Sequence, residues 1–182
     1  MKIDRIETFL MHAAPPGQGG WAARNWLFVK VYTDVGLTGV GEASGWPRVV
    51  QTAIQDLTPL LIGEDPHNIE RLWQKMMCSM MGHGMTGIVG AGAMTGIEMA
   101  LWDIKGKRLS APVWDLLGGK VRDRVRAIPL LGSSDYSGPL STPESFAKAA
   151  RLIKNDGYTA LKMTPFPANW GELAHGDLIR QN

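Results

Sequence analysis

An apolar segment that carries one lysine, near the end of the 182-residue chain, constrains the fold more than any other feature. Residues 158–165 predict a short buried strand, and residues 125–131 predict a second one. A helical pattern lies between them, and this order predicts a βαβ unit with parallel strands and a right-handed crossover. In a parallel barrel, reactive groups lie at the carboxyl ends of the strands. Lys162 occupies that position.

The pattern alone leaves two interpretations of Lys162. A lysine at a strand end is usually solvated and has no chemical role. Here the neighbours Ala160, Leu161 and Met163 are apolar, which predicts a partly desolvated amine. A desolvated lysine is a usable general base.

The helix between the two strands is predicted from its ends and its apolar spacing. Ser141 or Thr142 can act as the N-cap, Pro143 suits the first turn and Glu144 suits a capping box. The segment 155–157 ends with glycine and predicts the stop. The apolar side chains at helical spacing are Phe146, Ala149, Ala150 and Ile153.

The first part of the chain predicts an antiparallel meander. Residues 3–12, 26–33 and 37–43 read as strands, and a turn separates the last two. Gly39 and Gly41 inside the third strand predict a bulge or a close approach of another backbone.

Helices are expected after the meander. The first covers residues 50–61, where Pro59 is expected to break or kink it. A second is expected to start with Asp65 as its cap and Pro66 at its first position. A third is predicted to be strongly amphipathic, and a short turn follows over residues 113–117. The apolar stripe of the third helix is Met94, Ile97, Leu101 and Ile104.

These patterns predict an α+β domain over residues 1–120 and the first strands of a different domain over 121–182. Two parallel strands and one helix cannot bury both faces of a parallel sheet. We therefore expect the chain to be a truncated fragment, or to need more protein.

Composition excludes several classes of function. The formal net charge is +2 and basic residues are scattered, so no nucleic-acid partner is expected. The single cysteine excludes an internal disulfide. The sequence has neither a long apolar run nor a signal-peptide core, so we expect a cytoplasmic protein with no membrane partner.

Three separated segments resemble one known family. Residues 36–43 (GLTGVGEA) resemble the third strand of the N-terminal capping domain in the enolase superfamily, in its mandelate racemase/muconate-lactonizing enzyme branch. Residues 97–107 (IEMALWDIKGK) are similar to the helix of that domain, and residues 111–119 (APVWDLLGG) to the segment after it. All three occur in the order and spacing of the family.

The resemblance implies a two-domain enzyme in which the α+β domain caps a modified (β/α)8 barrel that begins near residue 125. It implies one Mg2+, held by three acidic ligands at the ends of the third, fourth and fifth barrel strands. Those ligands are expected beyond Asn182, so no metal ligand is assigned within the chain. In the family, the metal stabilises an enediolate, which forms when a base removes the proton α to a carboxylate.

Lys162 matches the first lysine of the family's Lys-x-Lys motif on the second barrel strand. Thr164 stands where racemases and lactonizing enzymes have their second lysine, which is their base. Its replacement favours a resemblance to acid-sugar dehydratases, in which a His-Asp pair from later strands can act as base. Lys162 would then neutralise charge or contact the substrate, and Thr164 would lie in the substrate site.

The family closes two capping-domain loops over its substrate, and they correspond here to about 13–25 and 44–48. Arg24 could pair with a substrate carboxylate, although a solvated arginine is the alternative. Trp26 could equally pack in the core. The tryptophans that could form the pocket wall are Trp21, Trp26 and Trp46. The side chains interpreted as structural are His12, His83, Glu42, Glu98 and Asp103.

The favoured hypothesis is a Mg2+-dependent acid-sugar dehydratase, which removes the α-proton of a small-molecule carboxylate and eliminates water. A racemase, epimerase or cycloisomerase of the same branch is the alternative enzyme, and Thr164 disfavours the racemase. The alternative of another class is a truncated, non-catalytic fragment. Family resemblance also implies a symmetric homo-oligomer.

Overall fold

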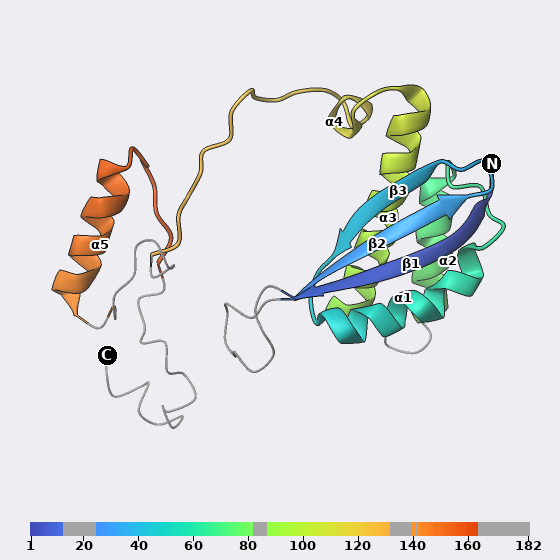
Figure 1. Ribbon diagram of the computed structural model, residues 1–182, viewed down its shortest axis with the longest axis horizontal. Helices are drawn as coiled ribbons and strands as arrows, with labels where there is room; N and C mark the ends of the chain where they lie inside the picture. Colours follow the sequence, from blue (N-terminus) through green and yellow to red (C-terminus); the bar gives the residue numbers. More distant parts are fainter. Residues whose placement is uncertain (13–24, 82–86, 132–139, 141, 164–182) are drawn as a thin grey trace. The chain divides into compact units, whose positions relative to one another are not determined.

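The computed structural model describes residues 1–12, 25–81, 87–131, 140 and 142–163. The chain divides into two compact units, Met1–Lys120 and Val121–Asn182. Figure 1 shows the elements of both units. No helix among the described residues is both long enough and apolar enough to cross a membrane.

The first unit contains a three-stranded antiparallel sheet in the order β1-β2-β3. The strands are β1 (Ile3–His12), β2 (Asn25–Thr33) and β3 (Thr38–Ala43), which confirms the predicted meander. Alternate residues of β2 are fully buried because they face the helices: Leu27, Val29 and Val31.

The helices of the first unit are α1 (Pro47–Leu61), α2 (Ile69–Met81), α3 (Ile88–Leu109) and α4 (Val113–Leu116). The three long helices, α1 to α3, lie on one side of the sheet (Figure 1). Of the break or kink predicted at Pro59, the break is wrong, because α1 continues through this proline to its end at Leu61.

The predicted start of α2 at Pro66 is also wrong. Asp65 closes a turn instead, since its side-chain Oδ1 accepts a hydrogen bond of 3.0 Å from the His67 backbone N–H. The Asp65 carbonyl accepts another from the Asn68 N–H at 3.1 Å. The helix begins at Ile69, and Asn68 accepts the hydrogen bond from the Leu72 N–H.

This turn places the His67 imidazole in a partly buried site, where its Nε2 atom is buried without a hydrogen-bond partner. Burial is the main cause that lowers the pKa of His67 below its ordinary value of 6.5. Asp65 opposes the lowering, whereas Arg108, Lys105 and the chain's amino terminus reinforce it.

We expect His67 to make the fold less stable in acid. Its pKa is lower in the folded state than in the unfolded state, so the unfolded chain binds the proton more readily. The stability that the neutral imidazole contributes is therefore fully present above pH 6.5. It is lost as the pH falls from 6.5 towards the lower folded-state pKa. Between neutral and mildly acidic pH, the urea unfolding midpoint should fall less in His67→Gln than in the original chain. His12→Gln is the matched control, and equal pH slopes in the original chain and in His67→Gln would contradict the prediction.

The prediction of an amphipathic third helix is wrong, because α3 is buried on more than one side. It contacts β2 and β3 as well as α1 and α2. Its buried residues are spread around the helix: Gly90, Gly92, Ala93, Met94, Gly96, Ile97, Ala100, Leu101, Ile104 and Gly106. The predicted stripe itself is buried, but the exposed residues of the helix include the apolar Ile88 and Met99. Apolar and polar residues therefore do not separate into two faces.

The contact between α3 and β3 confirms the close approach predicted from the strand glycines. A Cβ atom added to Gly41 would lie 2.0 Å from the Gly96 carbonyl oxygen. One added to Gly39 would lie 2.0 Å from the Ala100 carbonyl oxygen. The strand and the helix therefore meet backbone to backbone.

Polar side chains of α3 also bind β3, which is an edge strand. One oxygen of Asp103, Oδ2, accepts hydrogen bonds from the Val40 backbone N–H at 2.9 Å and from the Lys107 ammonium at 2.7 Å. The same ammonium donates to the Thr38 carbonyl at 2.8 Å. These bonds satisfy backbone groups that an edge strand otherwise leaves open.

The second unit contains α5 (Pro143–Asn155) and one parallel bridge between Leu130 and Lys162. The Leu131 N–H donates to the Lys162 carbonyl at 2.8 Å, and the Lys162 N–H donates to the Pro129 carbonyl at 2.9 Å. The parallel direction and the intervening helix agree with the predicted βαβ order. The described residues hold a bridge rather than two full strands.

The caps of α5 follow the sequence with one correction. Thr142 is the N-cap, and its Oγ1 accepts from the Ser145 N–H at 3.3 Å. The capping box uses the Ser145 hydroxyl, not Glu144, because the reciprocal position is the third residue of the helix. Gly157 follows the helix with a φ of +88°. The core of this unit joins Leu131 to the predicted helical stripe.

Candidate functional site

At one end of the first unit, strand ends and helix starts lie next to the loops that are predicted to contact substrate. We call it the loop end, and define it as His12, Asn25 and residues 44–46 and 87–88. The antiparallel register brings the end of β1 beside the start of β2 and the end of β3. The start of α3 lies at the same end, because Gly92 contacts the Ser44 carbonyl.

At the loop end, His12 and Asn25 join the last residue of β1 to the first residue of β2. The His12 Nδ1 atom lies 2.7 Å from the Asn25 side-chain Oδ1. An amide oxygen only accepts, so Nδ1 carries the proton in this contact. The pair supports the structural interpretation of His12, and it holds together the two ends of the segment 13–24.

The Ser44–Trp46 turn has a fixed backbone. A Cβ atom on Gly92 would lie 2.2 Å from the Ser44 carbonyl oxygen, so the turn lies directly on α3. Gly45 has a φ of +108°, which glycine adopts readily. The Trp46 carbonyl accepts from the Val50 N–H at 2.8 Å, which joins the turn to α1.

Trp46 is the predicted site residue that this turn carries, and its side chain is 71% exposed. A large aromatic ring presented on an anchored backbone is suited to contact a ligand. Trp26 does not pack in the core, because it is 43% exposed and lies opposite Met11 on the outer face of the sheet.

Lys162 lies in the second unit, with its backbone in the parallel bridge and its side chain exposed. The partial desolvation expected from its apolar neighbours is therefore not present among the described residues. Trp21, Arg24, Thr164 and His83 fall outside the described residues.

Two acidic residues of α3 make hydrogen bonds within the first unit. Asp103 binds the edge of β3, and Glu98 accepts a hydrogen bond from the Trp102 indole N–H at 3.4 Å. Glu42 is exposed on β3. Within the described ranges, no group of three or more histidine, cysteine, aspartate or glutamate side chains could hold a metal ion.

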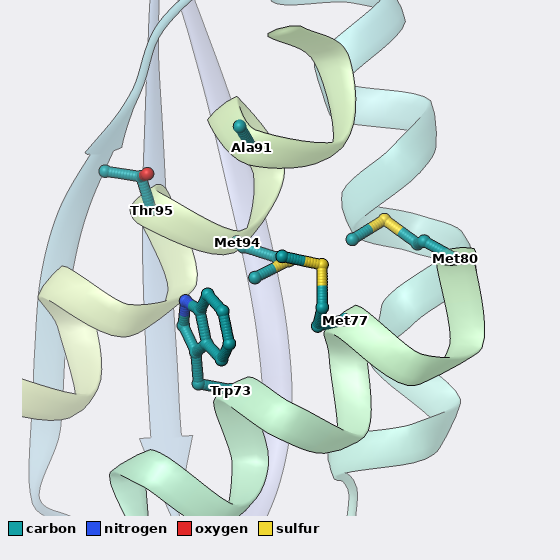
Figure 2. Close-up of a pocket in the computed structure, with 6 residues that line it drawn as sticks. All are labelled: Trp73, Met77, Met80, Ala91, Met94 and Thr95. Atoms are coloured by element: carbon teal, nitrogen blue, oxygen red, sulfur yellow. The ribbon is translucent and has the colours of Figure 1, made fainter. Parts of the chain in front are cut away.

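Sequence reasoning did not place the apolar cavity between α2 and α3, which has a volume of about 170 Å3 (Figure 2). The ten methionines of the chain are a signal for such a cavity, because flexible methionine side chains fill irregular apolar spaces. Its lining carries no titratable group, so it offers no acid or base. The lining residues are Trp73, Met77, Met80, Ala91, Met94 and Thr95.

Comparison with known proteins agrees with this architecture. Residues 6–118 match the N-terminal domain of the mandelate racemase/muconate lactonizing enzyme family. A D-galactonate dehydratase from Xanthomonas campestris pv. campestris is 44% identical over 134 residues, which cover 72% of this chain and 32% of that enzyme. The chain thus spans about a third of the length of the curated relatives it matches.

Solved structures give the same picture. The 3,6-anhydro-D-galactonate cycloisomerase of Zobellia galactanivorans superposes with a TM-score of 0.72 at 33% identity, over 90% of this chain and 42% of that one. An enolase from Agrobacterium radiobacter, described as a galactarate dehydratase with bound sodium and L-malate, has a TM-score of 0.72 at 29% identity. It matches 99% of this chain and 42% of its own.

The meander, the backbone contact between α3 and β3 and the match over residues 6–118 all lead to the same conclusion. The chain belongs to the mandelate racemase/muconate lactonizing enzyme family of the enolase superfamily and contains its N-terminal capping domain.

Proposed function

We propose that the protein to which this chain belongs is an acid-sugar dehydratase. The observation that carries the proposal is the 44% identity to a D-galactonate dehydratase over 134 residues. The reaction removes the proton α to the carboxylate of a sugar acid and expels the β-hydroxyl as water. The resulting enol becomes a 2-keto acid.

Five residues of this chain would act on the substrate. Lys162 would place its ammonium beside the carboxylate and stabilise the negative charge that grows as the α-proton leaves. Thr164 would offer a hydroxyl to the same region. Arg24 would pair with a carboxylate through its guanidinium. Trp21 and Trp46 would form an apolar wall that excludes water.

Residue 164 favours dehydration over racemisation. Racemisation needs a base on each side of the α-carbon, and Thr164 cannot act as one at neutral pH. A cycloisomerase is the second candidate, because one structurally similar protein has that activity on an anhydro sugar acid.

The family also implies Mg2+, but the described residues offer no cluster of carboxylates that fits it. We therefore propose that any Mg2+ requirement depends on residues outside the described ranges. Because this chain spans only about a third of the length of its curated relatives, we propose that it does not turn over sugar acids by itself.

The test is a panel of sugar acids, including D-galactonate and galactarate, given with Mg2+ to the protein made from its natural reading frame. The expected result is one 2-keto acid product for each equivalent of substrate. Reaction in deuterium oxide separates the alternatives. Inversion with deuterium at the α-carbon and no loss of water would identify a racemase and overturn the proposal.

The same panel should be run with the 182-residue chain. We expect no product and no site-specific Mg2+ binding at micromolar concentration. Turnover by this chain would contradict the proposal that the fragment is inactive, but it would leave the reaction type standing.

A further inference from the structure

The cavity between α2 and α3 is lined by methionine side chains from both helices. Met77 and Met80 lie three residues apart on α2 and therefore face the same side, and Met94 of α3 lines the same cavity. Figure 2 shows the side chains of Met77 and Met94 directed towards one another, with the Trp73 indole close to them. Three thioethers and one indole thus share a cavity of about 170 Å3.

The cavity is anchored in the core and also reaches solvent. Met80 and Met94 are each only 4% exposed, so the surrounding core holds them in place. Met77 and Trp73 are partly buried and pack against the same core. Thr95, which also lines the cavity, is exposed. A binding site for a small solute needs both features, because its ligands must be held and the solute must be able to enter.

The chemistry of this lining selects one class of ligand. A thioether sulfur is neutral and polarisable, and it binds soft metal ions such as Cu(I). Hard ions such as Mg2+ and Ca2+ need several oxygen ligands, whereas the side chains of this lining offer one oxygen, the Thr95 hydroxyl. The lining has no carboxylate to compensate the charge of a divalent ion. A soft monovalent cation therefore fits it best.

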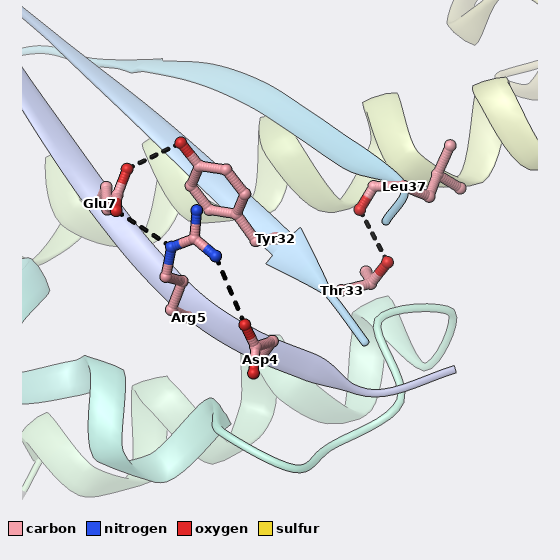
Figure 3. A network of polar contacts seen from close by, with 6 residues as sticks. All are labelled: Asp4, Arg5, Glu7, Tyr32, Thr33 and Leu37. Atoms are coloured by element: carbon pink, nitrogen blue, oxygen red, sulfur yellow. Dashed lines mark hydrogen bonds and ion pairs between the residues drawn. The ribbon is translucent and has the colours of Figure 1, made fainter. Parts of the chain in front are cut away.

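The indole in the lining also favours a cation. Among aromatic side chains, tryptophan attracts cations most strongly. The first unit already holds a cation on an aromatic ring, since the Arg5 guanidinium lies 3.6 Å from the centre of the Tyr32 ring (Figure 3). Among the described residues, lysine and arginine side chains lie over other aromatic rings but not over Trp73. The Trp73 indole is therefore available to a cation in the cavity.

We propose that this cavity binds one Cu(I) or Ag+ ion through the sulfur atoms of Met77, Met80 and Met94, with the Trp73 indole against the ion. A thioether has no proton to lose, so binding releases none and the affinity is the same at about pH 5 and about pH 8. Sites built from cysteine or histidine bind more weakly at the lower pH, because their ligands take up protons. The proposal does not depend on the proposed enzymatic function.

NMR of the methionine methyl groups tests the proposal directly. The 182-residue chain carries Cys78→Ser, because the exposed Cys78 thiol would itself bind soft ions. Methionine is labelled with 13C at its methyl group, and Ag+ is added as the nitrate. Single methionine-to-leucine variants assign the signals of the ten methionines. The signals of Met77, Met80 and Met94 should shift together and stop shifting at one equivalent of Ag+, at both pH values.

Leucine variants measure what each sulfur contributes. Loss of an outer partner of a metal ligand costs about 10- to 100-fold in affinity, so loss of a ligand should weaken Ag+ binding at least about tenfold. This is expected in both Met77→Leu and Met94→Leu, in which leucine keeps the core filled. Met99→Leu is the matched control, because Met99 is exposed on the same helix as Met94 and does not line the cavity. Circular dichroism should show the same fold in all variants.

Several results would overturn the proposal. One is a titration in which no methyl signal shifts at one equivalent of Ag+, and another is an equal shift of all ten methionine signals. Unchanged Ag+ affinity in Met77→Leu and Met94→Leu would overturn it as well. An affinity that falls sharply between about pH 8 and about pH 5 would assign the binding to histidine side chains instead of thioethers.

Discussion

Replacing Gly41 with alanine is expected to lower the free energy of unfolding of the first unit by about 3 kcal/mol or more. The new Cβ atom would lie 2.0 Å from the Gly96 carbonyl oxygen and 3.0 Å from the Ala100 nitrogen. Both are backbone atoms of a buried helix, so no side chain can rotate away. The strand and α3 would have to separate, and the core between them would lose its packing.

Urea unfolding followed by far-UV circular dichroism measures this loss. The control is Gly87→Ser, because an added Cβ there meets no atom within 4 Å and the φ of −73° suits any residue. Serine is also a favoured N-cap residue, so this variant should be as stable as the original chain or slightly more stable. A cost below about 1 kcal/mol for Gly41→Ala would mean that α3 does not lie against β3 as described.

Replacing Lys162 with alanine is expected to lower the kcat/KM of the proposed dehydratase on the order of 100-fold or more. The ammonium would be lost from the place where negative charge develops on the substrate. If Lys162 acts on the transition state, kcat should fall more than KM rises. Arginine at this position should restore only part of the activity. It keeps the positive charge, but its planar guanidinium differs in shape from the lysine ammonium.

The measurement is steady-state kinetics on the protein made from its natural reading frame. Lys154→Ala is the matched control, since Lys154 is an exposed lysine in the last turn of α5 within the same unit. Full activity in Lys162→Ala would show that Lys162 does not take part in the reaction. It would not by itself exclude dehydration, which is judged by the product.

Much of the fold could be predicted because its signals are local. The alternation of Leu27, Val29 and Val31 sets which face of β2 is buried, and the structure confirms it. Thr142 before Pro143 predicted the start of α5, and Asn155 to Gly157 predicted its end. These signals depend on caps and on period, which neighbouring residues determine without help from the rest of the chain.

One error came from tertiary packing and another from a local turn. The apolar stripe of α3 suggested one buried side, but Gly92 and Gly96 are buried as well. The Ser44 carbonyl lies on Gly92, and Ala43 and Val29 lie on Gly96. Asp65 and Pro66 have the composition of a helix start. The Asp65 side chain instead accepts a hydrogen bond from the His67 backbone. Its carbonyl accepts one from the Asn68 N–H, so residues 65–68 form a turn before the helix begins.

The candidate site was predictable in part. Pattern and resemblance placed Trp46 in a loop, and the structure shows its ring exposed on an anchored turn. The exposure of the Lys162 side chain could not be foreseen, because the burial of a strand-end lysine depends on neighbouring strands that are distant in sequence. The hydrogen bond between His12 and Asn25 also depends on strand register, which composition does not reveal.

The hydrogen bonds from α3 to the edge of β3 also have a consequence in time. Asp103 lies 63 residues after Val40, the residue whose N–H it binds. At a synthesis rate of about 5–20 residues per second, β3 waits roughly 3 to 13 seconds for Asp103 to be translated. During that interval the nascent meander has an unprotected strand edge that can pair with other chains. Slowing translation between β3 and α3 should therefore raise the fraction of the protein that aggregates at the ribosome.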